Sequence, residues 1–230
     1  MHHTSRVVCI VFVLLCCTVT SIPQQPTSNA RDDYLSWTAD RANDIGKQWR
    51  VNGRAGGALD LRVIHTEHAY NYKLRATLMT PEVIRATARL EQLRMRLTDA
   101  QTRELVAEAE KTEGLVILVE IDPQEGSGVI PLEWRSTLRP KGAKEDSSLT
   151  IPGINSPGLR RVKALAGVAR RDYAYDVFWV LFPFKDQQGK PIWETPPDAI
   201  ELLVGIYNKE GRVNWPVSEQ LRQHLINSRR

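Results

Sequence analysis

The sequence predicts a mainly β fold, an antiparallel β-sandwich for which an immunoglobulin-like arrangement is one form. It also predicts an inserted α-helical hairpin and an N-terminal helix. Three observations lead to this fold class: apolar and polar residues alternate over 70–78, a continuous apolar run covers 115–121, and Gly and Pro separate short apolar segments in the last third. A single helical pair interrupts these segments, which disfavours a doubly wound parallel sheet.

The N-terminus has the pattern of a secretory signal peptide. All three cysteines fall within the first 17 residues, and an apolar run over 7–17 is followed by small residues. This pattern predicts a signal peptide over 1–21, cleaved after Ser21, and therefore a cysteine-free mature chain. We expect a secreted or periplasmic protein that meets the membrane only transiently, through this peptide. A lipid-anchored form, modified at Cys16 or Cys17, is the alternative.

Two further segments precede the main domain. Residues 22–31 are rich in Pro, Gln and Ser, which is typical of a disordered tether. Apolar residues recur at three- and four-residue spacing over 32–49, and a Gly-rich stretch follows. We therefore expect an N-terminal helix and linker over 32–57, and a β-sandwich domain over 58–230.

The helical hairpin is predicted at 81–111. Thr80 is a good N-cap and Pro81 is favoured at the first helical position. Thr98 and Gln101 have the spacing of a capping box, so a second helix begins there with almost no loop between the two. The buried-strand pattern at 115–121 then suggests that this hairpin covers one face of a sheet.

The last half is predicted to consist of short strands and turns. Composition indicates a mobile loop over 139–158, and a four-residue connection at 208–211 closes a hairpin. The expected strands lie at 129–138, 162–168, 176–182, 200–207 and 212–217.

Charge and motifs exclude several function classes. The chain has 31 Lys and Arg against 27 Asp and Glu, a balance that gives no reason to expect a nucleic-acid partner. Nucleophile-elbow and phosphate-loop motifs are absent from the sequence, and we expect no cofactor. The favoured function is a non-catalytic interaction or structural module with an unknown protein or glycan partner.

The best candidate for a recognition loop lies between two predicted strands. Arginine binds acidic groups with two parallel hydrogen bonds, and tyrosine adds flat contact area. The residues of this loop are Arg170, Arg171, Tyr173 and Tyr175. The alternative is a simple turn whose tyrosine rings cover the end of the core.

Two alternative functions rest on other residue types. A secreted metal-dependent hydrolase would use the histidines and nearby carboxylates His65, His68, Glu67, Glu120 and Asp122. On a straight strand, positions 65 and 68 point to opposite faces, so that site needs a bend between them. A carbohydrate-binding module would stack sugars on exposed indoles, for which the candidates are Trp134, Trp193 and Trp215.

Overall fold

The computed structural model describes residues 33–56, 72–123, 133–144, 147–167 and 176–228. The chain divides into two compact units, Met1–Asp33 and Tyr34–Arg230. The predicted signal peptide and tether lie outside the described residues.

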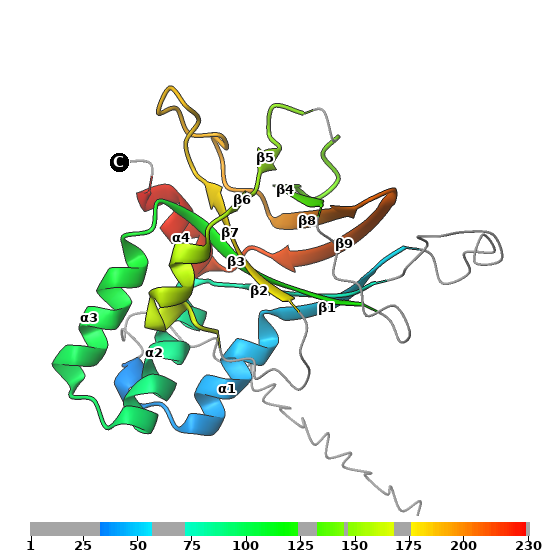
Figure 1. Ribbon diagram of the computed structural model, residues 1–230. Helices are drawn as coiled ribbons and strands as arrows, with labels where there is room; N and C mark the ends of the chain where they lie inside the picture. The colour runs from blue at the N-terminus through cyan, green and yellow to red at the C-terminus, as the bar shows by residue number, and fades with distance from the viewer. Residues whose placement is uncertain (1–32, 57–71, 124–132, 145–146, 168–175, 229–230) are drawn as a thin grey trace, which may run out of the picture. The chain divides into compact units, whose positions relative to one another are not determined.

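The unit Tyr34–Arg230 combines helices with a larger number of strands (Figure 1). The helices are η1 (Tyr34–Ser36), α1 (Ala39–Gln48), α2 (Pro81–Met95), α3 (Asp99–Glu110), η3 (Pro157–Arg161), η4 (Lys163–Leu165) and α4 (Glu219–Asn227). The strands are β1 (Arg50–Ala55), β2 (Tyr72–Leu78), β3 (Gly114–Pro123), β4 (Trp134–Pro140), β5 (Ile151–Pro152), β6 (Ile154–Asn155), β7 (Asp176–Pro183), β8 (Ala199–Ile206) and β9 (Lys209–Pro216).

All nine strands belong to one antiparallel sheet, in the order β5-β4-β8-β9-β1-β2-β3-β7-β6. Its two edge strands, β5 and β6, are separated in the chain by Gly153 alone, so residues 151–155 join both edges. The sheet therefore curls into nearly a barrel (Figure 1). The prediction of a mainly antiparallel β fold with helices is confirmed. The two-sheet, immunoglobulin-like arrangement is not confirmed, because the paired strands form a single sheet.

The barrel closes where there is no room for a side chain. The Gly153 amide donates to the Ser136 carbonyl of β4 at 2.9 Å, and the Ser156 amide donates to the Trp179 carbonyl of β7 at 2.7 Å. A Cβ atom at Gly153 would meet the Ser136 hydroxyl and would lie 2.6 Å from Val180 Cγ1. Only glycine lets the backbone approach both strands this closely.

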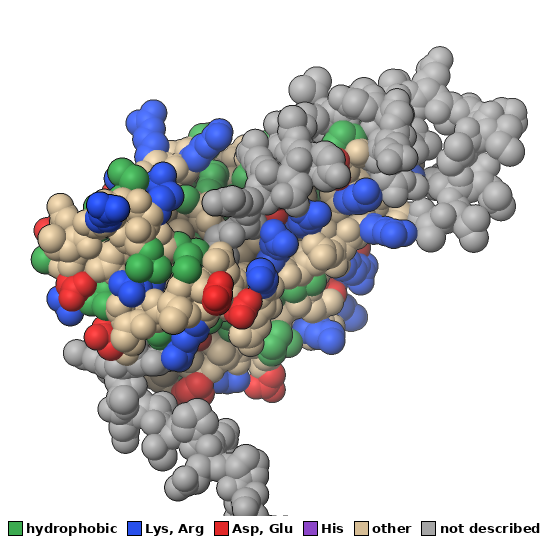
Figure 2. Space-filling view, turned by 90° about the horizontal axis from the view of Figure 1, so that it is seen from below, with side chains coloured by type: hydrophobic (Ala, Val, Ile, Leu, Met, Phe, Trp, Pro, Cys, Tyr) green, Lys and Arg blue, Asp and Glu red, His purple; other side chains and the backbone are tan. Residues whose placement is uncertain are grey.

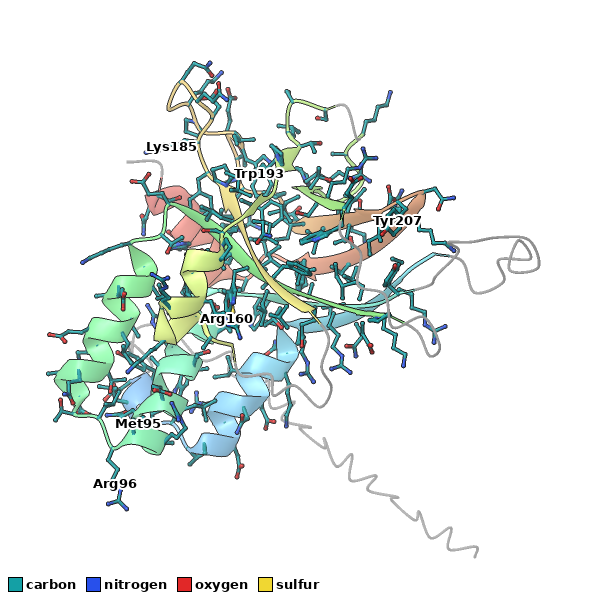
Figure 3. All side chains as sticks on the ribbon, viewed as in Figure 1. Met95, Arg96, Arg160, Lys185, Trp193 and Tyr207 are labelled. Carbon is teal, nitrogen blue, oxygen red and sulfur yellow. The ribbon has the colours of Figure 1, made fainter. Side chains whose placement is uncertain are left out.

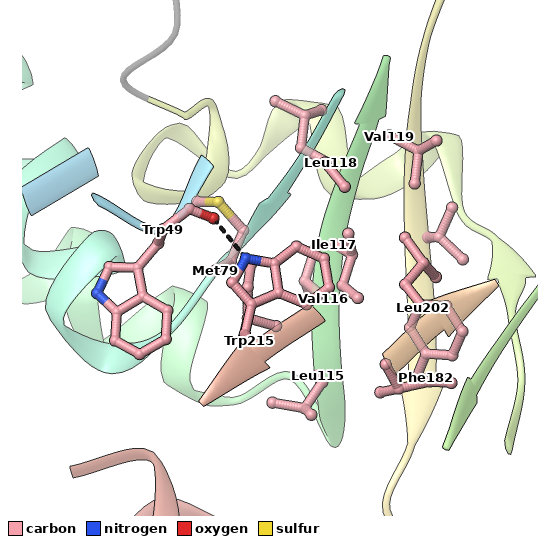
Figure 4. Close-up of a cluster of buried hydrophobic side chains, with 14 of the residues drawn as sticks. Trp49, Met79, Leu115, Val116, Ile117, Leu118, Val119, Phe182, Leu202 and Trp215 are labelled. Carbon is pink, nitrogen blue, oxygen red and sulfur yellow. Dashed lines mark hydrogen bonds between the residues drawn. The ribbon is translucent and has the colours of Figure 1, made fainter. Parts of the chain in front are cut away.

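The inner face of the curled sheet forms the core. Large side chains fill it, and Trp215 of β9 is only 1% exposed. Its indole nitrogen donates to the Trp49 carbonyl at 2.8 Å, as the dashed line in Figure 4 shows. Buried tryptophans need a partner for this N–H group, and the bond ties β9 to the junction of α1 and β1.

The helices cover part of the outer face and begin as the sequence predicts. Thr80 caps α2 by accepting from the Val83 amide, and Thr98 and Gln101 form the capping box of α3. The predicted hairpin is therefore confirmed. Both faces of β3 are buried from Gly114 to Ile121, as expected of a covered strand. The N-terminal helix packs on α2 through a small cluster of Trp37, Ala42 and Ala86.

Three elements differ from the sequence predictions. The predicted linker contains β1, because Gly53 and Ala55 face a crowded interior that accepts only small residues. The predicted mobile loop at 139–158 contains β5 and β6, which are too short to show a period. The predicted strand at 162–168 holds the 3-10 helix η4 instead, whose Ala164 and Leu165 are buried.

The C-terminal third adds two further differences. The β8–β9 turn is Tyr207-Asn208, not the predicted four residues at 208–211. Gly211 lies inside β9, where a Cβ would lie 3.0 Å from both Arg54 O and Leu74 Cδ2. Helix α4, which the sequence analysis did not predict, is capped by Ser218 and packs Leu221 and Leu225 inward.

We predict that G153A destabilises the protein by about 1–3 kcal/mol, since the added methyl group overpacks the closure. G158A is the matched control, because a Cβ there meets nothing within 4 Å. Urea unfolding measures both free energies. Equal midpoints for the two variants would contradict this role of Gly153.

Candidate functional site

The outer face of β1, β2, β4 and β9 is exposed, and its side chains are mostly cationic or polar. Strand residues alternate between the two faces of a sheet, so the positions between the core residues point outward. These outward residues are Arg50, Asn52, Arg54, Lys73, Arg75, Arg135, Glu210, Arg212 and Asn214. Figure 2 shows Lys and Arg side chains gathered on the side of the sheet where β1 and β2 lie.

The strand register brings three of these cations side by side. Arg54 of β1 lies directly opposite Lys73 of β2. On its other side, Ala55 pairs with Gly211 of β9. One residue further in this antiparallel register, Arg54 lies beside Arg212. The central arginine therefore has a cation on each neighbouring strand.

A fourth cation reaches the same group from β4. Arg135 pairs with Gly205 of β8, and a Cβ at Gly205 would lie 3.1 Å from Arg135 Nε. The arginine therefore leans across β8 towards β9, over a position without a side chain. On β9, Glu210 Oε1 accepts a hydrogen bond from Arg212 Nε at 2.6 Å. We call Arg135, Arg212, Arg54 and Lys73 the cationic row.

Three members of the row carry no counter-charge. Among the described residues, Arg54, Lys73 and Arg135 form no ion pair within 4.0 Å. On the same outer face, Arg139 of β4 does find a partner. Its Nη2 lies 2.8 Å from Glu201 Oε2 of β8, and both side chains are buried. The sheet thus pairs these two buried charges, whereas the row has one ion pair among the described residues, that of Arg212 with Glu210.

The row is unfavourable for folding. Neighbouring strands lie about 4.8 Å apart, and like charges directly opposite each other are destabilising by a fraction of a kcal/mol to about 1 kcal/mol. Nothing in the packing of the sheet offsets this repulsion at Arg54. Cations held close together in this way are suited to bind anions, which would remove the repulsion.

Two predicted metal ligands lie on β3, next to the row. Glu120 is opposite Arg75 and Asp122 is opposite Lys73 across the β2–β3 pair. Glu120 is 2% exposed, and its Oε2 atom has no hydrogen-bond partner. His65, Glu67 and His68 lie outside the described residues. No group of three or more potential metal-binding side chains occurs in the described part of the chain.

The structure places the predicted tryptophans in the core or at its edge. Trp193 and Trp215 are 6% and 1% exposed, and Trp193 donates through Nε1 to the Leu149 carbonyl at 2.7 Å. Neither indole presents a face to solvent. Trp134 is half-buried, with its ring centre 4.7 Å from that of Phe178.

The predicted recognition loop, with Arg170, Arg171, Tyr173 and Tyr175, lies outside the described residues. An apolar hollow with a cavity volume of only about 10 Å³ opens to solvent in the described part of the unit. It is lined by Ile151, Phe184, Pro191, Trp193, Pro196 and Leu225. Because this lining offers almost no polar group to orient a ligand, the hollow defines no chemistry.

One histidine of the described chain has a perturbed pKa. The His224 ring of α4 packs edge-on against Phe184, with 5.7 Å between ring centres. Burial lowers the pKa of His224 below its usual 6.5. The carboxylates of Glu110 on α3 and Glu82 on α2 raise this pKa in part, and Arg85 of α2 lowers it further. His224 is therefore a structural contact between α4 and the core.

No protein-family model, curated protein or solved structure matches the chain. Within the described residues, no helix is long and apolar enough to cross a membrane. Function is therefore inferred from surface chemistry, and the cationic row is the candidate site. Sequence reasoning missed it by using net charge, although the polar positions of the alternating strands already held these cations.

We predict that R54Q raises the free energy of unfolding by about 0.2–1 kcal/mol at low salt, because it removes repulsion from both neighbours. R103Q on the exposed face of α3 removes the same charge elsewhere and serves as the control. Urea unfolding at low and high salt measures both effects, and salt should erase the difference. If R54Q is less stable than the wild type, the row is not repulsive.

We predict that His224 makes stability fall on acidification. Its folded pKa is below the unfolded value of 6.5, so the unfolded chain takes up the proton first. The contribution of His224 to the free energy of unfolding is therefore lost as pH falls through 6.5 towards the folded pKa. Urea unfolding of wild type and H224Q from about pH 8 to about pH 5 isolates this contribution. Parallel curves for the two proteins would rule it out.

Proposed function

We propose that the protein is an exported, non-catalytic binding module that holds an extended polyanion on its cationic row. The observation that carries this proposal is Arg54, which has a cation on each side and forms no ion pair with any described residue. Such an arrangement opposes folding, so a ligand that neutralises it accounts for its presence.

The shape of the row favours a polymer over a small anion. Its four members lie on β4, β9, β1 and β2, and with β8 between the first two they span about 19 Å at the usual strand spacing. Arg54, Lys73, Arg135 and Arg212 are all exposed. A small anion needs donors that converge in a sheltered site, whereas a chain of negative charges can contact a linear, exposed row.

Two further observations support the remaining parts of the proposal. The N-terminal pattern of a short apolar run followed by small residues supports export. The lack of a nucleophile motif in the sequence, and of a metal-ligand cluster in the described residues, supports binding without catalysis.

Inorganic polyphosphate is a suitable probe, because it carries charge and nothing else for a protein to recognise. We predict that the charge reversal R54E/K73E weakens polyphosphate binding by at least about tenfold, through lost attraction and new repulsion. Isothermal titration at low salt measures the affinity, and added salt should weaken wild-type binding steeply.

The matched control is R103E/K111E, which makes the same change in net charge on α3 and at its C-cap. Its affinity should stay within about twofold of the wild type, since it lies away from the row. Equal losses in the two variants would show that only net charge matters. Wild-type protein that does not bind polyphosphate at all would refute the proposed function.

A further inference from the structure

One aromatic residue lies exposed at the tip of the β8–β9 hairpin. Tyr207 is 54% exposed, and it is the single exposed aromatic side chain among the described residues. Its side chain makes no ring contact, hydrogen bond or ion pair with the described residues. Packing therefore gives no reason for a large ring at this position.

The backbone conformation at Tyr207 is also unfavourable for a large side chain. Its φ is +53°, in the left-handed region that favours glycine or asparagine. Asn208, the next residue, would suit such a position better. A bulky residue kept in this conformation costs stability, and such costs occur preferentially at functional sites.

Tyr207 lies at the end of the cationic row. Gly205, two residues earlier in β8, pairs with Glu210 and lies beneath the Arg135 side chain. Two strand residues span about 7 Å, so Tyr207 lies about 7 Å along the hairpin from the position over which the Arg135 side chain leans. Figure 3 shows Tyr207 on the β8–β9 hairpin, far from the C-terminal end of α2, where Met95 and Arg96 lie.

Uncharged hydrogen-bonding groups accompany the cations. Asn52 of β1 comes two residues before Arg54, and Asn214 of β9 comes two residues after Arg212, so both amides point outward on the same face as these arginines. Both are exposed, and neither side chain forms a hydrogen bond with the described residues. An amide offers donors and an acceptor, which matches hydroxyl groups and not phosphate oxygens alone.

We propose that the polyanion is an acidic polysaccharide. Its carboxylate or sulfate groups lie on the cationic row, one sugar ring stacks on Tyr207, and its hydroxyl groups bond to the amides of Asn52 and Asn214. This inference rests on the proposed function and names its ligand. Surfaces for single-stranded nucleic acid stack successive bases on several aromatic side chains, and the described surface offers one.

The test compares three probes on wild type, Y207N and Y207F: polygalacturonate, polyphosphate and an oligothymidylate. We expect Y207N to weaken polygalacturonate binding by at least about tenfold and to leave polyphosphate binding within about twofold. Y207F keeps the ring and should bind polygalacturonate nearly as the wild type does. Thermal unfolding checks that Y207N is at least as stable as wild type, because asparagine tolerates the backbone conformation better.

The outcomes separate this inference from the proposed function. If wild type binds polyphosphate but not polygalacturonate, or if Y207N weakens neither, the ligand assignment is wrong and the cationic row stands. If Y207N weakens only the oligothymidylate, the ligand is a single-stranded nucleic acid and the assignment is again wrong. If wild type binds none of the three probes, the proposed function fails as well.

Discussion

Residues 151–155 pair with β4 on one side and β7 on the other, and the rest of the structure depends on this double pairing. It joins the two edges of the sheet through a glycine that has no space for a Cβ atom. With the edges joined, the inner face becomes one continuous core, plugged at one end by Trp215. The outer face is then free to carry polar groups wherever helices do not cover it.

Local signals in the sequence account for most of the individual elements but not for their closure. Period-two alternation predicted β2, and the capping residues Thr80 and Thr98 fixed both starts of the helical hairpin. The closing segment has two residues on each side of Gly153, too few to show a period. Whether a set of antiparallel strands forms two sheets or curls into one depends on such long-range pairing, so the sandwich prediction had no local basis.

Part of the candidate site could have been predicted from the sequence. Lys73 and Arg75 already stood out as the polar positions of the clearest strand, and Arg54 and Arg212 follow the same alternation. What the sequence lacked was the register that places Arg54 between Lys73 and Arg212. The nearly balanced net charge gave no indication that positive charges are concentrated on one surface. The strained backbone at Tyr207 is likewise a property of the folded hairpin.

The outer face of β1, β2 and β9, together with the β8–β9 turn, is the surface that we propose binds the ligand. Nuclear magnetic resonance of the ¹⁵N-labelled protein titrated with polygalacturonate tests this most directly. We expect amide shifts to change progressively at Arg54, Lys73, Tyr207 and Arg212, with α3 and α4 unaffected. Changes confined to the helices, or to the apolar hollow around Trp193, would contradict the account.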